Sequence, residues 1–101
     1  MIMLDANYIL RFLLKDNEQM YEISKECIKN NDCMIENEVL AEVVFVLLKV
    51  YEVKKTDIKN SLVDFISFEN IIMNHKDDII DSLRVFSDKN LDFVDSILCV
   101  I

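Results

Sequence analysis

The chain begins with a short apolar run that stops at an acid and an amide, Met1-Ile2-Met3-Leu4-Asp5-Ala6-Asn7. A continuous apolar run of this length fits a strand buried on both faces of a parallel sheet, so Asp5 is expected at the carboxyl end of that strand. In open α/β sheets this end faces the ligand crevice, where an acid can serve metal or phosphate chemistry. The alternative is that Asp5 only caps the helix that follows. Position alone leaves both roles open.

Composition limits the classes of protein to which the chain can belong. Its 101 residues, of which 52% are hydrophobic, are enough for a single globular domain, residues 1–101, with its own core. It contains no Gly and no Pro, which excludes the glycine-rich loops that cradle nucleotide phosphates. The net charge of -8 opposes a nucleic-acid groove built from Lys and Arg. If the chain binds nucleic acid, we expect divalent cations held by carboxylates to supply the positive charge.

Cysteine usage and hydropathy favour a cytoplasmic protein. The cysteines, Cys27, Cys33 and Cys99, are odd in number and form no Cys-x-x-Cys pair, so we expect reduced core or subsurface residues rather than disulfides or zinc ligands. No basic leader precedes Asp5. The longest later apolar run, 43–48, is far too short to span a bilayer, so we expect no membrane association.

Apolar periodicity predicts alternating helices and short strands. The predicted helices cover residues 7–14, 18–29, 37–51, 56–67 and 76–87, the predicted strands 33–35 and 70–73, and a final helix starts near residue 92. The expected N-caps are Asp16 or Asn17, Asn37 and Thr56. The only histidine, His75, is expected to be a turn or cap residue rather than a ligand.

Glu42 is the one polar residue between Val39 and Leu48. A helix that is apolar on all sides is normally buried on all sides, so Glu42 is expected in a place that excludes water. An unpaired buried carboxylate costs on the order of several kcal/mol. It must therefore be protonated, paired with a cation such as Arg11, or bound to a metal ion. The sequence favours a functional carboxylate.

Two further acids occur at the start of the final helix, Asp92 and Asp95. Asp92 is favoured as the N-cap, which places Asp95 in the first turn. Asp95 is surrounded in sequence by apolar residues and is expected to enter the same dry pocket as Glu42. Those neighbours are Phe93, Val94, Ile97 and Leu98.

These three stretches, in this order, resemble the PIN domain family, in particular the VapC-type toxins of bacterial toxin–antitoxin pairs. The stretches are Leu4-Asp5-Ala6-Asn7 leading into Leu10-Arg11-Phe12-Leu13-Leu14, then Val39 to Leu47, then Leu91 to Leu98. The resemblance covers essentially the whole chain. It implies an α/β fold of three layers, α/β/α, with a short parallel sheet. It also implies a Mg2+ or Mn2+ dependent ribonuclease, held in check by a cognate antitoxin.

The resemblance also assigns the site residues. Asp5, Glu42 and Asp95 match the metal-binding acids of the family, and Asn7 matches the polar residue two places after the first acid. Ala6 stands where Thr or Ser is common, and Asp92 is a further candidate. The acids would hold one or two ions that bind the scissile phosphate of an RNA substrate and activate a water. Glu42 could instead act as the general base.

The chain departs from the family pattern at its end. Family members usually continue for roughly another strand, helix and strand, which implies that C-terminal strands are absent here and that one flank of the first strand is open. We therefore expect a fragment, a natural truncation or a chain completed by a partner. Alone it should have weak or no ribonuclease activity, and a homodimer is the expected assembly. The alternative function is a non-catalytic PIN remnant that serves as a protein-interaction or dimerisation module.

Overall fold

The computed structural model describes residues 1–89 and 91–100. These residues form three short strands, β1 (Ile2–Met3), β2 (Cys33–Met34) and β3 (Ile71–Ile72). They also form six helices, α1 (Ala6–Leu14), α2 (Glu18–Lys29), α3 (Asn37–Lys49), α4 (Lys55–Ile66), α5 (Lys76–Asp88) and α6 (Phe93–Val100). Every predicted element is present, and most boundaries agree within two residues.

The strands form one parallel sheet in the order β1-β2-β3. Ile2 pairs with Cys33, which pairs in turn with Ile71. Flanking hydrogen bonds extend each ladder, including Leu4 N–H to the Met34 carbonyl at 2.9 Å. The expected α/β class with a short parallel sheet is confirmed. β1 lies at one end of the sheet, and no described residue pairs with its outer side.

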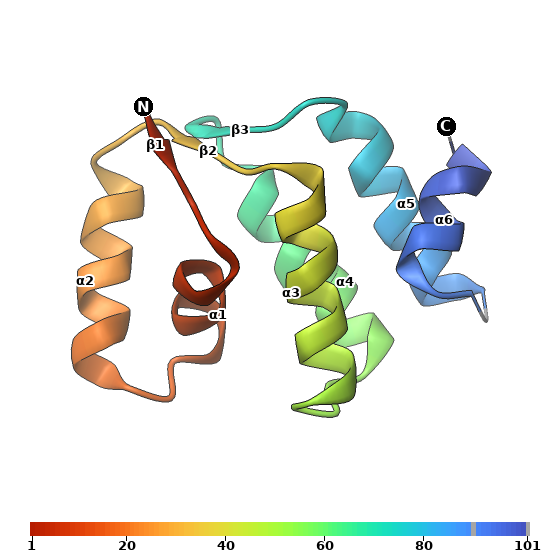
Figure 1. Cartoon of the computed structure of the whole chain (residues 1–101), viewed down its shortest axis with the longest axis horizontal. Coiled ribbons are helices and arrows are strands. Elements are labelled where there is room, and N and C mark those ends of the chain that lie inside the picture. The colour runs from red at the N-terminus through yellow and green to blue at the C-terminus, as the bar shows by residue number, and fades with distance from the viewer. Residues whose placement is uncertain (90, 101) are drawn as a thin grey trace.

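The helices pack in a continuous series beneath the strands, which run along the upper edge of Figure 1. α1 packs on α2 and α3, α4 on α3 and α5, and α6 on α5 and α3. Their apolar faces meet in one core whose largest fully buried side chains include Phe65, Phe86, Ile9, Leu40 and Leu83. The consequence for the site is that α3 lies between α1 and α6 (Figure 1).

Local capping explains where several helices begin. Asn17 Oδ1 accepts a hydrogen bond from Met20 N–H at 3.0 Å, which confirms Asn17 as the cap of α2. The predicted caps Asn37 and Thr56 are wrong, since α3 and α4 begin earlier, after Glu36 and Lys54, and neither cap residue makes a side-chain bond. The first residue of α4, Lys55, also makes a tertiary contact, in which its Nζ donates to the Leu91 carbonyl at 2.7 Å.

His75 precedes α5 with a left-handed backbone, φ 56°, and its side chain makes no cap bond. This confirms its assignment as a turn residue. The longest described helices, α3 and α5, have 13 residues each, too few to cross the hydrocarbon core of a bilayer.

The three cysteines are free thiols with very different exposure: Cys33 is buried, Cys27 half-buried and Cys99 exposed. Cys99 therefore corrects the expectation of core or subsurface positions, because α6 turns this residue towards solvent. Burial raises the pKa of the Cys33 thiol, and the nearby Cys27 and Asp32 add to the rise. Since the thiolate is the reactive form, burial and pKa both slow the chemistry of Cys33.

Alkylation of the folded chain with iodoacetamide is expected to modify Cys99 first, Cys27 next and Cys33 last. Peptide mapping by mass spectrometry after increasing reaction times measures the order. Modification of Cys33 at the rate of Cys99, in conditions where circular dichroism shows a folded chain, would contradict the packing of β2.

Candidate metal site

Asp5 follows β1 directly and is the N-cap of α1. Its extended backbone, φ -93° and ψ 170°, lets Oδ1 accept a hydrogen bond from Tyr8 N–H at 2.8 Å. The carboxylate also benefits from the positive end of the helix dipole. The capping alternative is thus correct, yet it uses only one oxygen. Oδ2 accepts no hydrogen bond from any described residue, and the side chain is exposed, so it remains available to a ligand.

Tyr8 connects the start of α1 to α2. The neighbouring Cys27 thiol is the largest cause of a raised Tyr8 pKa, followed by burial, with the Asp5 carboxylate contributing further. Tyr8 therefore stays protonated at neutral pH. Tyr8, whose backbone N–H donates to Asp5, therefore also lies beside Cys27 of α2.

Glu42 lies in the middle of α3 and is exposed, so the expectation of a dry site is wrong. The buried face of α3 consists of Leu40, Val43, Val44 and Leu47. Solvent reaches a stripe on another face that contains Glu38, Glu42, Phe45 and Lys49, which are spaced by three or four residues. α1, α4 and α6 cover only part of the helix circumference, and Glu42 falls on the uncovered part.

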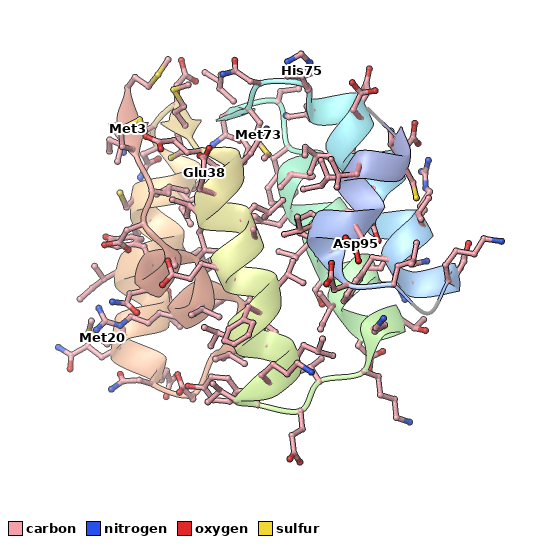
Figure 2. The ribbon with its side chains drawn as sticks, turned by 45° about the vertical axis from the view of Figure 1, so that its right-hand side comes forward. Met3, Met20, Glu38, Met73, His75 and Asp95 are labelled. Carbon is pink, nitrogen blue, oxygen red and sulfur yellow. The ribbon has the colours of Figure 1, made fainter. Side chains whose placement is uncertain are left out.

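Asp95 is also exposed, in the first turn of α6, where Figure 2 labels it. Its backbone N–H donates to Asp92 Oδ1 at 2.8 Å, which confirms Asp92 as a cap. Ser96 Oγ–H donates to the Asp92 carbonyl at 2.8 Å and strengthens this turn. The expectation that Asp95 enters a dry pocket is wrong, because Asp95 and its neighbours Val94 and Leu98 face solvent, and the latter two are 58% and 72% exposed.

The three acids therefore occur on neighbouring elements, since α1 packs on α3 and α3 packs on α6. Residues 1–89 and 91–100 nevertheless contain no group of three or more His, Cys, Asp or Glu side chains arranged to hold one metal ion. The carriers of the acids are adjacent, but the carboxylates are not gathered into one cluster. Nor does the described part of the chain pair Arg11 with Glu42, the cationic partner considered from the sequence.

The two additional candidates, Asn7 and Asp92, line different grooves. Asn7 lines a groove of about 280 Å³ with Leu10, Arg11 and Asp16, between α1 and the start of α2. Asp92 lines a groove of about 310 Å³ between α3 and α6, with Phe45 and Val94 among the other walls. Neither groove is lined by Asp5, Glu42 or Asp95.

Sequence reasoning missed a polar hollow of about 330 Å³ at the carboxyl ends of β2 and β3. Its lining residues are Met34, Ile35, Glu36, Asn37, Glu38 and Asn74, and Figure 2 shows Glu38 at the start of α3. Asn37 Oδ1 is buried and has no hydrogen-bond partner among the described residues. The signal was available, because polar residues directly follow both predicted strands, where ligands bind in open α/β sheets.

The family model of the PIN domain matches residues 2–100. The chain belongs to the PIN domain family. No curated protein and no solved structure matches the chain. The PIN domain is a nuclease-type fold with an RNA-related function, and PIN domains generally depend on divalent metal ions. The arrangement seen here, a short parallel sheet with helices packed beneath it, agrees with that fold.

The donor set of this PIN domain suits Mg2+ or Mn2+ chemically. Both ions prefer carboxylate and other oxygen ligands, and Mg2+ usually keeps several of its waters. Asp5, Glu42 and Asp95 offer exposed carboxylates, and none of them forms an ion pair within the described residues. The residues therefore fit a hydrated ion better than a fully dehydrated one.

Proposed function

We propose that this PIN domain is a metal-dependent ribonuclease of the VapC toxin type, which cleaves RNA phosphodiester bonds with Mg2+ or Mn2+ held by Asp5, Glu42 and Asp95. One observation carries the proposal: Asp5 is fixed at the carboxyl end of β1 by Tyr8 N–H while its second oxygen stays free. A rigid carboxylate with an unused oxygen, at the ligand-binding end of a parallel sheet, is what a metal ligand requires.

A bound ion would lower the pKa of a water and offset the repulsion between RNA and a chain of net charge -8. The chain's own residues supply position and proton transfer. Asp92 caps α6 and so fixes the turn that carries Asp95. Glu42, exposed on α3, can accept a proton from the attacking water instead of binding metal. Asn7, exposed on the first turn of α1, can donate its side-chain amide to a phosphate oxygen.

The same proposal includes a cognate antitoxin as partner and a cytoplasmic location. Exposed apolar side chains gather at the groove between α3 and α6, where Phe45 is 59% exposed beside Val94. Apolar side chains grouped on a surface commonly mark a protein contact, and a homodimer could use the same surface. The three free thiols are consistent with a reducing compartment.

A second candidate function is a non-catalytic PIN remnant that binds another protein. The observation that favours it is the absence of a ready metal cluster in the described part of the chain. The two functions are distinguished by RNA cleavage: a ribonuclease cleaves RNA when Mg2+ or Mn2+ is present, and a non-catalytic remnant does not.

The proposal is tested by incubating the purified chain with structured and single-stranded RNA in Mg2+ or Mn2+. We expect weak cleavage that EDTA abolishes, because the bound ion would lower the pKa of the attacking water and polarise the scissile phosphate. A folded chain that leaves every RNA intact with both ions would favour the remnant instead. Circular dichroism on the same sample confirms that the chain is folded.

A further inference from the structure

A second surface, formed by residues other than the three acids, combines apolar walls with a cationic rim. It is a groove of about 310 Å³ between α2 and the turn that precedes β3. Its lining residues are Phe12, Lys25, Ile28, Lys29, Phe68 and Asn70. None of the proposed metal ligands lines it. We call it the α2 groove.

The walls of the α2 groove are held in place by hydrogen bonds. Asn70 Nδ2 donates to the carbonyls of Ile28 at 2.6 Å and Asn31 at 3.0 Å, which joins the end of α2 to the start of β3. Lys76 Nζ donates to the carbonyls of Phe68, at 3.2 Å, and Ile71. These bonds fix the turn that carries Phe68, so a ligand that binds in the groove does not lose free energy by ordering this turn.

The Phe68 ring is supported from behind although it is 48% exposed. It packs edge-on against Phe65 at a centroid distance of 6.4 Å, and Phe65 packs against Phe12 at 5.4 Å. An aromatic side chain that is held by the core and still faces solvent is a suitable anchor point for an apolar side chain of a partner.

The charge of the α2 groove is opposite to that of the whole chain. Lys25 and Lys29 lie on successive turns of α2, both are exposed, and neither forms an ion pair with another described residue. No carboxylate lines the groove. In a chain of net charge -8, two unpaired ammonium groups beside an apolar wall favour an anionic occupant.

We propose that the α2 groove binds an acidic segment of a partner protein, which places one large apolar side chain between Phe12 and Phe68 and pairs carboxylates with Lys25 and Lys29. The volume is at the lower end of ligand pockets, which suits one side chain rather than a cofactor. RNA fits less well, since two lysines neutralise only two phosphates of a strand that carries a negative charge at every nucleotide. The proposal does not depend on ribonuclease activity.

The test uses the whole 101-residue chain labelled with 15N and two blocked synthetic peptides. One has the sequence Glu-Asp-Phe-Leu-Asp-Glu, and the other replaces each acid by Lys. We expect the acidic peptide alone to shift the amide signals of Lys29, Phe68 and Asn70. The double variant Lys25→Glu/Lys29→Glu should weaken binding by at least about tenfold, because each ion pair becomes a repulsion.

The matched control is Lys54→Glu/Lys89→Glu, which changes the net charge equally at exposed sites outside the groove. It should bind the acidic peptide within about twofold of the parent chain, since charges outside an interface mainly affect association rates. Equal losses in both double variants would overturn the proposal, as would shifts on α3 and α6 instead. Tighter binding of oligouridine at the same amides would also overturn it and assign the groove to RNA.

Discussion

Asp5→Asn is expected to reduce metal-dependent RNA cleavage by at least about 100-fold, since even residues that only support metal ligands contribute 10- to 100-fold. Asn can still accept the hydrogen bond from Tyr8 N–H, so the cap of α1 and the stability of the fold should be retained. The substitution therefore separates the charge of Asp5 from its capping role. Initial cleavage rates at saturating Mn2+, together with thermal melting of both proteins, measure the two roles.

Asp5→Ala is the companion variant, because it removes the charge and the cap together. It should lose activity as Asp5→Asn does and lose about 1 kcal/mol of stability as well. An Asp5→Asn protein that cleaves RNA at the parental rate would exclude Asp5 as a ligand.

Glu42→Gln should lower cleavage to a similar degree, and the structure provides a matched control on the same helix. Glu38 lies one turn earlier on the same exposed stripe of α3, and it lines the polar hollow at the strand ends. Glu38→Gln should leave the cleavage rate within about threefold of the parent, because surface substitutions outside a site have small effects. A larger loss with Glu38→Gln than with Glu42→Gln would place the metal in the hollow instead.

Phe65→Ala is expected to destabilise the fold by about 3–5 kcal/mol, a large share of the roughly 5–15 kcal/mol that holds a domain together. The Phe65 ring is 2% exposed and packs between Phe12 and Phe68. Its removal leaves a cavity among side chains of α1 and α4 that cannot close without moving both helices. The melting temperature should fall by more than about 10 °C.

Phe45→Ala is the control for this prediction. Phe45 lies in the most apolar stretch of the sequence yet is 59% exposed, so its loss should change stability by no more than about 0.5 kcal/mol. Chemical denaturation of both variants gives the two free energies of unfolding. Equal destabilisation by Phe45→Ala and Phe65→Ala would contradict the orientation of α3.

Features that depend on local sequence could be predicted well. Short apolar runs marked β1, β2 and β3, and spacing by three or four residues marked the helices, because each element buries one side against the core. Asn17 and Asp92 were identifiable as caps because their side chains bond to backbone only three residues away. The order of the three acids was sufficient to indicate the PIN family.

Features that depend on packing between distant segments could not be predicted from the sequence. Ten consecutive positions around Glu42 contain only one polar residue, so no periodicity reveals that one stripe of α3 remains open to solvent. The same holds for Asp95, since its apolar sequence neighbours are shared between the core and the surface. The unpartnered oxygen of Asn37 arises from the packing of α3 against the strand ends, which local patterns do not contain.

The central claim is that Asp5, Glu42 and Asp95 hold one metal site, and Mn2+ tests it directly because it broadens NMR signals of nearby amides. Substoichiometric Mn2+ is added to the 15N-labelled chain and to Asp5→Asn, and the loss of each amide signal is compared. We predict that the amides of Asp5, Glu42 and Asp95 broaden together in the parent chain and lose this selectivity in Asp5→Asn. Selective broadening around Glu36, Glu38 and Asn74, or no selective broadening anywhere, would contradict the claim.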